Sequence, residues 1–84
     1  FFNSAIPTIN DFGALLDISV NTTDQTIYIP NTSRFANSGY ILLGDEIIYY
    51  ANKLSDRFYN CTRGALGSVA KTHNAGDYLR TYTF

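Results

Sequence analysis

The chain has 84 residues and a formal net charge of -1, and these two facts exclude several classes of function. A chain of this length forms one domain and buries only about 60 to 65% of the surface that its unfolded form exposes. Its 6 lysines and arginines are scattered along the sequence, which excludes the basic footprint that nucleic acids or an acidic membrane surface require. We therefore expect no nucleic acid partner and no membrane partner.

The chain contains a single cysteine, Cys61, so it cannot form an internal disulfide. Its fold must then rest on apolar burial and backbone pairing, which suits a protein that assembles in a reducing cytoplasm. The sequence begins with Phe1 instead of a methionine and shows no secretory leader. We expect the chain to be either a processed product or, in preference, a piece of a longer polypeptide.

The first twelve residues are predicted to form an N-terminal arm or linker, followed by a small β domain over residues 13–84. The arm has apolar side chains without a clean period and a proline at position 7. Such side chains are costly to leave in water. We expect the arm to bury them on this domain or on a neighbouring subunit, and the candidate contacts are Phe1, Phe2, Ile6 and Ile9.

Two short strands are expected after the arm. Residues 13–20 alternate in polarity from Leu16 onward, which predicts a strand. After a polar turn, residues 26–30 predict a second strand that ends at Pro30, because proline cannot donate to a ladder. We expect these two strands to form a hairpin.

The next segment, residues 31–38, has room for at most one helical turn. We expect its Phe35 to fill part of the core. Arg34 and Phe35 are also candidate contacts with a partner protein, together with the arm.

Residues 39–64 predict a three-strand antiparallel meander, the central element of the fold. Residues 40–43 and 46–51 are short apolar, β-branched and aromatic runs, separated by Gly44-Asp45. Glycine followed by aspartate suits a two-residue hairpin turn, because it supplies a positive φ and a short polar side chain. This turn pairs Leu43 with Glu46 across the hairpin.

A polar loop over residues 52–56 is expected to lead to the third strand, residues 57–62. Both faces of the meander carry apolar residues, which is typical of strands inside a small barrel or sandwich. After it we expect a glycine-containing loop over residues 64–68, a short helical turn over residues 69–73 and a last strand over residues 78–83. The residues assigned to turns are Gly44, Asp45, Gly64, Gly67 and Gly76.

The fold class that follows is all-β: a small antiparallel barrel or sandwich of about six short strands around the central meander over residues 40–62. An open sheet edge at residues 26–30 or 78–83 would allow a neighbouring chain to add a strand.

The sequence offers no convincing catalytic constellation. Cys61 and His73 are its one pair that resembles a nucleophile and a base, and no third residue stands out to orient them. Asp45 and Glu46 are adjacent, so a strand would direct them to opposite faces. We predict a protein that is not an enzyme, with no catalytic residues, no cofactor and no metal site.

Glu46 and Arg63 are instead predicted to form a structural ion pair. They lie at the start of the second strand and the end of the third strand of the meander. Because antiparallel neighbours place such positions side by side, a bidentate contact between carboxylate and guanidinium is expected. His73 is expected to join this pair, and the network would fix the loop from Gly64 to Gly67.

A set of residues in the second half of the chain is similar to a known family in order and spacing. They are Gly39-Tyr40-Ile41, Gly44-Asp45-Glu46-Ile47-Ile48-Tyr49-Tyr50, Cys61-Thr62-Arg63-Gly64, Gly67-Ser68, Ala70, His73, Gly76 and Asp77. The combination resembles a small β domain that recurs in tail and baseplate proteins of tailed bacteriophages. The likeness covers about half the chain closely, and it departs from the family at Arg34 and over residues 1–12.

The resemblance implies a non-enzymatic virion structural protein, a connector or interaction module of the tail or baseplate. Its implied partners are other virion structural proteins in a symmetric assembly of several copies. Its implied location is the virion, with the host cytoplasm during assembly. The alternative is a carbohydrate- or receptor-binding module of a phage tail, because the 7 tyrosines and 6 phenylalanines could provide a sugar-binding platform.

Overall fold

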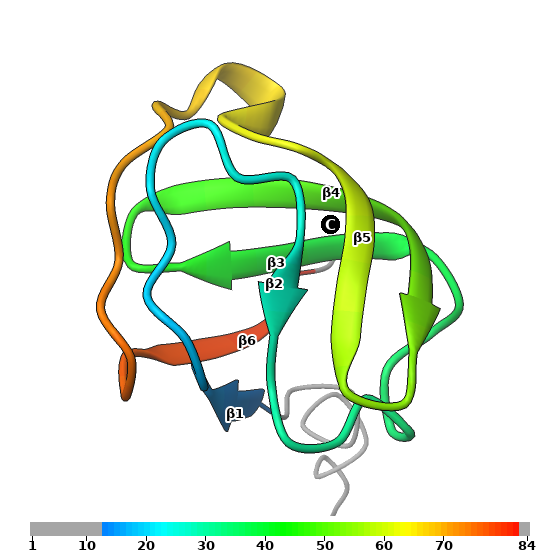
Figure 1. Ribbon diagram of the computed structural model, residues 1–84. Coiled ribbons are helices and arrows are strands. Elements are labelled where there is room, and N and C mark those ends of the chain that lie inside the picture. The colour runs from blue at the N-terminus through cyan, green and yellow to red at the C-terminus, as the bar shows by residue number, and fades with distance from the viewer. Residues whose placement is uncertain (1–12, 83–84) are drawn as a thin grey trace, which may run out of the picture.

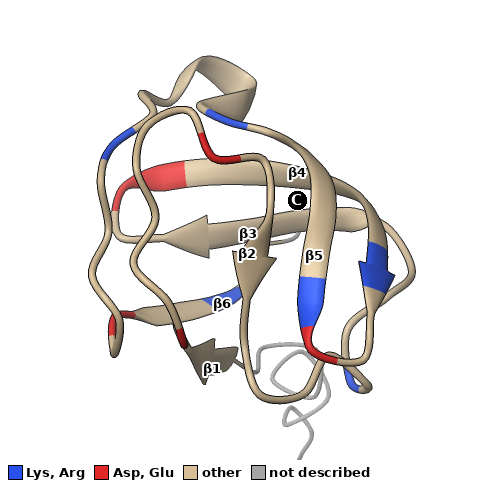
Figure 2. Cartoon of the chain, viewed as in Figure 1, with Lys and Arg blue, Asp and Glu red and all other residues tan. Residues whose placement is uncertain are grey.

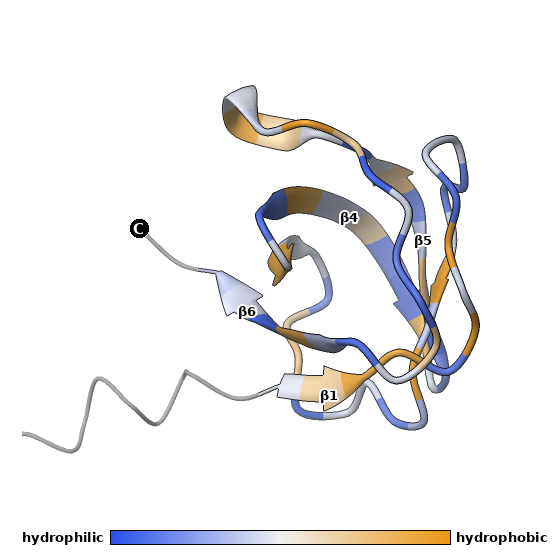
Figure 3. Ribbon diagram, turned by 90° about the vertical axis from the view of Figure 1, so that its left-hand side faces the viewer, coloured by the Kyte–Doolittle hydropathy of each residue, from blue (hydrophilic) through white to orange (hydrophobic). Residues whose placement is uncertain are grey.

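The computed structural model describes residues 13–82, which form one antiparallel sheet curled into a half-barrel (Figure 1). The strands are β1 (Gly13–Leu15), β2 (Ile27–Tyr28), β3 (Gly39–Leu43), β4 (Glu46–Leu54), β5 (Arg57–Thr62) and β6 (Tyr78–Tyr82), with a short 3-10 helix η2 (Ala65–Gly67). Their order across the sheet is β1-β6-β3-β4-β5-β2. The curl is plain in the side view of Figure 3. The predicted all-β fold class is confirmed.

The predicted meander is confirmed as β3, β4 and β5. Gly44 has a φ of 62° in the turn between β3 and β4, which is the left-handed conformation that glycine adopts without steric cost. Leu43 pairs with Glu46 and Ile41 pairs with Ile48, as this two-residue turn requires.

The loop predicted over residues 52–56 is wrong in extent, because β4 continues to Leu54 and leaves a turn of only two residues. Lys53 pairs with Phe58 on β5, and its ammonium group donates to the carbonyl oxygens of Thr32 (2.6 Å) and Phe35 (2.7 Å). Lys53 therefore belongs to β4 instead of a loop. Its side chain holds the neighbouring segment 31–36 in place.

The hairpin predicted between residues 13–20 and 26–30 does not form. β1 pairs with β6, and β2 pairs with β5. The first strand also stops at Leu15, because the backbone changes partners directly afterwards: the amide of Leu16 donates to Asp77 (2.8 Å) and the amide of Asp17 donates to Tyr28 (2.9 Å). Ile18 is consequently 54% exposed, although the polarity pattern predicted it to share a buried face.

The edges of the sheet also differ from the prediction. β6 lies between β1 and β3, so residues 78–82 are not an open edge, and β1 takes that position. β2 is the other edge strand, as predicted. The bond from Asp17 to Tyr28 joins the segment after β1 to this second edge, which begins to close the barrel.

The short helical turn predicted over residues 69–73 is absent. His73 instead forms an isolated β-bridge with Val20, and the two residues exchange backbone hydrogen bonds of 2.9 and 2.8 Å. This bridge brings two loops together that are 53 positions apart in the sequence.

The core fills the inside of the curl. Phe35 is 5% exposed and packs edge-on against Phe58, with ring centroids 5.0 Å apart. Tyr50 packs on the same ring at 4.4 Å and donates from its hydroxyl to Ala36 (2.9 Å), while burial raises its pKa to about 12. The apolar side chains with no exposed surface belong to Ile27, Ile29, Ile41, Leu43, Ile48, Phe58 and Leu79.

Within residues 13–82, no helix has the length and apolar character needed to cross a bilayer.

Candidate functional site

Glu46 and Arg63 form the bidentate pair that the strand geometry predicts. Arg63 Nε lies 2.7 Å from Glu46 Oε2, and Arg63 Nη2 lies 2.9 Å from Glu46 Oε1. The Glu46 side chain has no exposed surface and that of Arg63 is 7% exposed. The pair is therefore a buried ion pair, in which a carboxylate and a planar guanidinium match in two parallel hydrogen bonds.

His73 joins the pair, as expected, and two backbone amides complete the contacts of the carboxylate. His73 Nε2 lies 2.7 Å from Glu46 Oε1. It must donate in this bond, because an ionised carboxylate only accepts. The amides of Gly64 (3.0 Å) and Lys71 (3.1 Å) donate to the same carboxylate. Glu46 thus accepts five hydrogen bonds.

Arg63 connects this cluster to two loops. Its Nη1 donates to the carbonyl oxygens of Asn21 and Asp24, and its Nη2 donates to that of Lys71 at 2.7 Å. With the two bonds to Glu46, the guanidinium uses all five of its N–H groups. Figure 2 shows that both acidic and basic positions of the chain occur at this end of the barrel, where β4 begins and β5 ends.

These contacts decide the charge state of Glu46. Burial alone would raise the pKa of this carboxyl, but the hydrogen bonds from Arg63, His73 and the amides of Lys71 and Gly64 outweigh that cost and lower its pKa to about 2. Glu46 is therefore ionised at neutral pH and fully occupied by partners.

The Cys61 thiol is buried, with 4% of the residue exposed. Burial raises its pKa to about 12, although the charge of Arg63 opposes the rise. At pH 7 the reactive thiolate is thus on the order of one part in 10⁵. Its partner in the catalytic hypothesis, His73, is already bonded to Glu46. The catalytic hypothesis thus pairs a protonated thiol with an imidazole that Glu46 already holds.

The turn residues named from the sequence lie where they were predicted. Gly64, Gly67 and Gly76 have φ values of 59°, 85° and 93°. Gly64 also has little space, because an added Cβ would lie 3.0 Å from the backbone nitrogen of Ala70. Leu66, between the first two glycines, adopts a φ of 55° although it carries a side chain. This loop therefore stores backbone strain at an exposed leucine.

An outer tyrosine face covers the central strands on the side away from the core. It consists of Tyr40, Leu42, Ile47, Tyr49, Arg80 and Tyr82, each partly exposed. Tyr40 pairs across the sheet with both Tyr49 and Tyr82, so three tyrosines stand in one row. The rings of Tyr40 and Tyr49 are 5.2 Å apart and inclined by 58°. The sequence predicted that both faces of the meander carry apolar residues, but it did not show that Tyr82 of β6 would stand beside Tyr40 and Tyr49.

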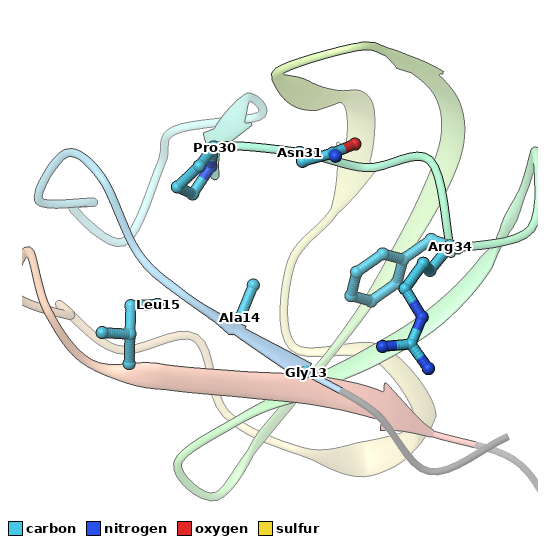
Figure 4. Close-up of a pocket in the computed structure, with 7 residues that line it drawn as sticks. Gly13, Ala14, Leu15, Pro30, Asn31 and Arg34 are labelled. Carbon is cyan, nitrogen blue, oxygen red and sulfur yellow. The ribbon is translucent and has the colours of Figure 1, made fainter. Parts of the chain in front are cut away.

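An apolar pocket of about 350 Å³ lies on another side, between β1 and residues 30–35 (Figure 4). Arg34, a candidate partner contact, is exposed and lines this pocket. Phe35 also lines it but is otherwise part of the core, so it is poorly placed for a direct partner contact. The other candidate contacts, Phe1, Phe2, Ile6 and Ile9, lie outside the described residues.

Residues 13–82 contain no group of three or more histidine, cysteine, aspartate or glutamate residues placed to hold a metal ion. Comparison of the chain with protein-family models, with curated proteins and with solved structures finds no match.

Proposed function

We propose that this chain is a non-enzymatic structural module of a virion, a connector or interaction domain in the tail or baseplate of a tailed bacteriophage. The motif resemblance suggests this role. The observation that carries the proposal is the closed cluster of Glu46, Arg63 and His73, because it commits the most chemically capable side chains of the described chain to holding loops together.

The exterior supports the same role. The outer tyrosine face presents aromatic and aliphatic side chains and a single arginine on a rigid sheet. Tyrosine and arginine are the residue types that contribute most to protein interfaces. In a symmetric particle such contacts are repeated, so modest individual affinities add up to stable attachment.

Photo-crosslinking in assembled particles tests this role. A photoreactive amino acid in place of Tyr49, within the outer tyrosine face, is expected to crosslink to another virion protein. The matched control carries the same amino acid in place of the exposed Thr22, outside that face. The proposal would be overturned if the photoreactive residue at position 49 formed no crosslink to a virion protein. It would also be overturned if purified particles did not contain the chain.

The alternative function is that of a carbohydrate- or receptor-binding module. Its candidate binding site is the small pocket next to Tyr40, Tyr50 and Tyr82. That pocket has about 140 Å³, whereas sites for small ligands usually have roughly 300 to 1,000 Å³. The inclination of Tyr40 against Tyr49 also gives no flat platform for a sugar ring. A saccharide titration followed by tyrosine fluorescence distinguishes the two functions, since we expect no saturable change.

A further inference from the structure

The loop that contains η2 carries an apolar projection at one end of the barrel, and we call its two side chains, Leu66 and Val69, the η2 knob. Leu66 is 55% exposed and Val69 is 67% exposed. An added Cβ at Gly67, between them, would meet no atom within 4 Å. Ser68 anchors the loop, because its Oγ accepts a hydrogen bond of 2.9 Å from the Ile47 amide on β4. Two large apolar side chains are thus held in water by a well-anchored loop.

The backbone at Leu66 is strained in this position. Its φ of 55° is unfavourable for a residue that carries a Cβ. Strain of this kind persists only where the surrounding structure imposes it, and it is found preferentially at functional positions. The exposed leucine therefore points to a contact that the isolated chain does not make.

The apolar pocket lies at the opposite end of the barrel from the η2 knob. Figures 1 and 3 both show β1, one wall of the pocket, at the end away from η2. Ala14 and Leu15 line the pocket on β1, and Pro30 and Phe35 line it on the facing segment. Its volume of about 350 Å³ is more than twice the roughly 150 Å³ of an apolar cavity that holds one benzene molecule. The pocket therefore has room for two aliphatic side chains.

An exposed charge accompanies each of these two surfaces, and the two charges have opposite signs. Lys71 lies two positions after Val69, and Asp17 lies two positions after Leu15. Within residues 13–82, neither side chain has a hydrogen-bond or ion-pair partner. Arg34, the basic residue of the pocket, lies at the side away from Leu15 (Figure 4). A positive charge thus flanks the projection, and a negative charge flanks the Leu15 side of the recess.

We propose that the η2 knob of one copy of this chain docks into the apolar pocket of a second copy, with Lys71 of the first facing Asp17 of the second. Every copy carries both surfaces, so identical chains supply complementary partners. The contact is heterologous, since it joins two different surfaces, and it repeats head-to-tail into a ring or a filament. A single contact of this size is weak, but repetition in an assembly strengthens it.

The inference goes beyond the proposed role in the virion and does not depend on it. The surfaces involved are the two ends of the barrel, whereas the proposed role rests on the outer tyrosine face. Crosslinking from Tyr49 can therefore fail while the contact between copies holds, and the reverse is equally possible.

Sedimentation equilibrium of the full 84-residue chain, at concentrations up to about 1 mM as in a shared assembly, tests the contact. We expect the average mass to rise with concentration. Lys71→Glu and Asp17→Lys should each raise the dissociation constant about tenfold, because each replaces attraction by repulsion. The double variant exchanges the two charges and should bring the dissociation constant back to within about threefold of the original value.

The apolar part of the contact has its own variant and control. Replacing both Leu66 and Val69 with serine should abolish the association, while circular dichroism shows that the protein remains folded. The matched control is Leu54→Ser, at a leucine that is 49% exposed and belongs neither to the η2 knob nor to the pocket lining; it should leave the association unchanged. A monomer at every concentration, or an association that the serine variant retains, would overturn the inference. So would a charge exchange that fails to restore the association.

Zero-length crosslinking provides a second measurement. A carbodiimide joins a carboxylate to an ammonium group that touches it, and a mixture of isotope-labelled and unlabelled copies distinguishes links between chains from links within one chain. We expect a mixed-isotope peptide pair in which Lys71 of one copy is joined to Asp17 of another. Links between copies that never include this pair would assign the association to another surface and would contradict the inference.

Discussion

At the scale of single residues, Glu46 is the side chain to which several separate segments of the described chain bond. Its carboxylate bonds to Arg63 directly after β5, to the following loop through Gly64 and Lys71, and to the Val20 bridge through His73. Such a residue specifies the path of several loops at once. A buried ion pair of this kind is costly to break, because the partner left behind is a buried charge.

The change Glu46→Ala is therefore expected to lower the free energy of unfolding by about 3 to 5 kcal/mol. That is a large share of the roughly 4 to 13 kcal/mol that a domain of this length possesses. Urea denaturation followed by circular dichroism measures the loss. Asp45→Ala, at the exposed neighbouring position, should stay within about 0.5 kcal/mol of the unaltered protein; equal denaturation midpoints for both variants would contradict a structural role of Glu46.

The pH dependence of stability follows from the same carboxyl. Its pKa is lowered from 4.5 to about 2 on folding, so the unfolded chain binds the proton more tightly than the folded protein does. The stabilisation is fully present above the unfolded pKa and is lost as the pH falls from about 4.5 to 2. Thermal melts across this range should show a decline that Glu46→Gln reduces. An equal decline in that variant would exclude Glu46 as the source.

Sequence reasoning found this pair because the start of β4 and the end of β5 lie at the same end of two antiparallel neighbours, which brings Glu46 near Arg63. It could not find the carbonyl oxygens of Asn21, Asp24 and Lys71 that Arg63 also binds. Those atoms belong to the backbone of loops, and no side-chain pattern encodes where a loop carbonyl will point.

At the scale of elements, the sequence predicted the hairpin that a local turn determines, but it did not predict which distant strands pair. The Gly44 turn fixes the β3–β4 hairpin within a few residues, so the meander was predictable. The partners of β1 and β2 lie 67 and 31 positions away, as the pairs Gly13 with Arg80 and Ile27 with Phe58 show. Alternation reveals that a segment is a strand, but it does not reveal the strand with which a distant segment pairs.

The loop around η2 provides a test at this scale. Leu66 is 55% exposed and adopts a φ of 55°, a conformation that costs a residue with a side chain roughly 1 to 2 kcal/mol. Leu66→Gly relieves this strain but adds flexibility to the unfolded chain, so we expect a net gain of about 0.5 to 1 kcal/mol. Urea denaturation measures the gain, and Val69→Ala in the same loop should change little. Destabilisation by Leu66→Gly would show that the leucine side chain stabilises the loop.

At the scale of the whole molecule, the half-barrel separates its two kinds of surface. Charged groups with partners close one end, while the outer tyrosine face lies on the central strands and the apolar pocket lies between β1 and residues 30–35. Figure 3 shows apolar segments in β1, β4 and β5 among hydrophilic loops.

Cys61→Ala separates a structural role from a catalytic one. Because the thiol is buried and its pKa is about 12, we expect a modest loss of stability from the smaller side chain and, under the proposed virion role, normal incorporation into particles. Western blotting of purified particles measures incorporation. Particles that contain the variant but fail in a chemical step of infection would support a reactive cysteine instead.

The central claim is that this fold is a protein-binding scaffold whose outer tyrosine face is covered in the assembled particle. A density map of the intact virion, with the chain traced among its neighbours, tests it most directly. The account predicts another virion protein packed on Tyr40, Tyr49 and Tyr82. A map in which these three side chains face solvent in every copy would contradict it.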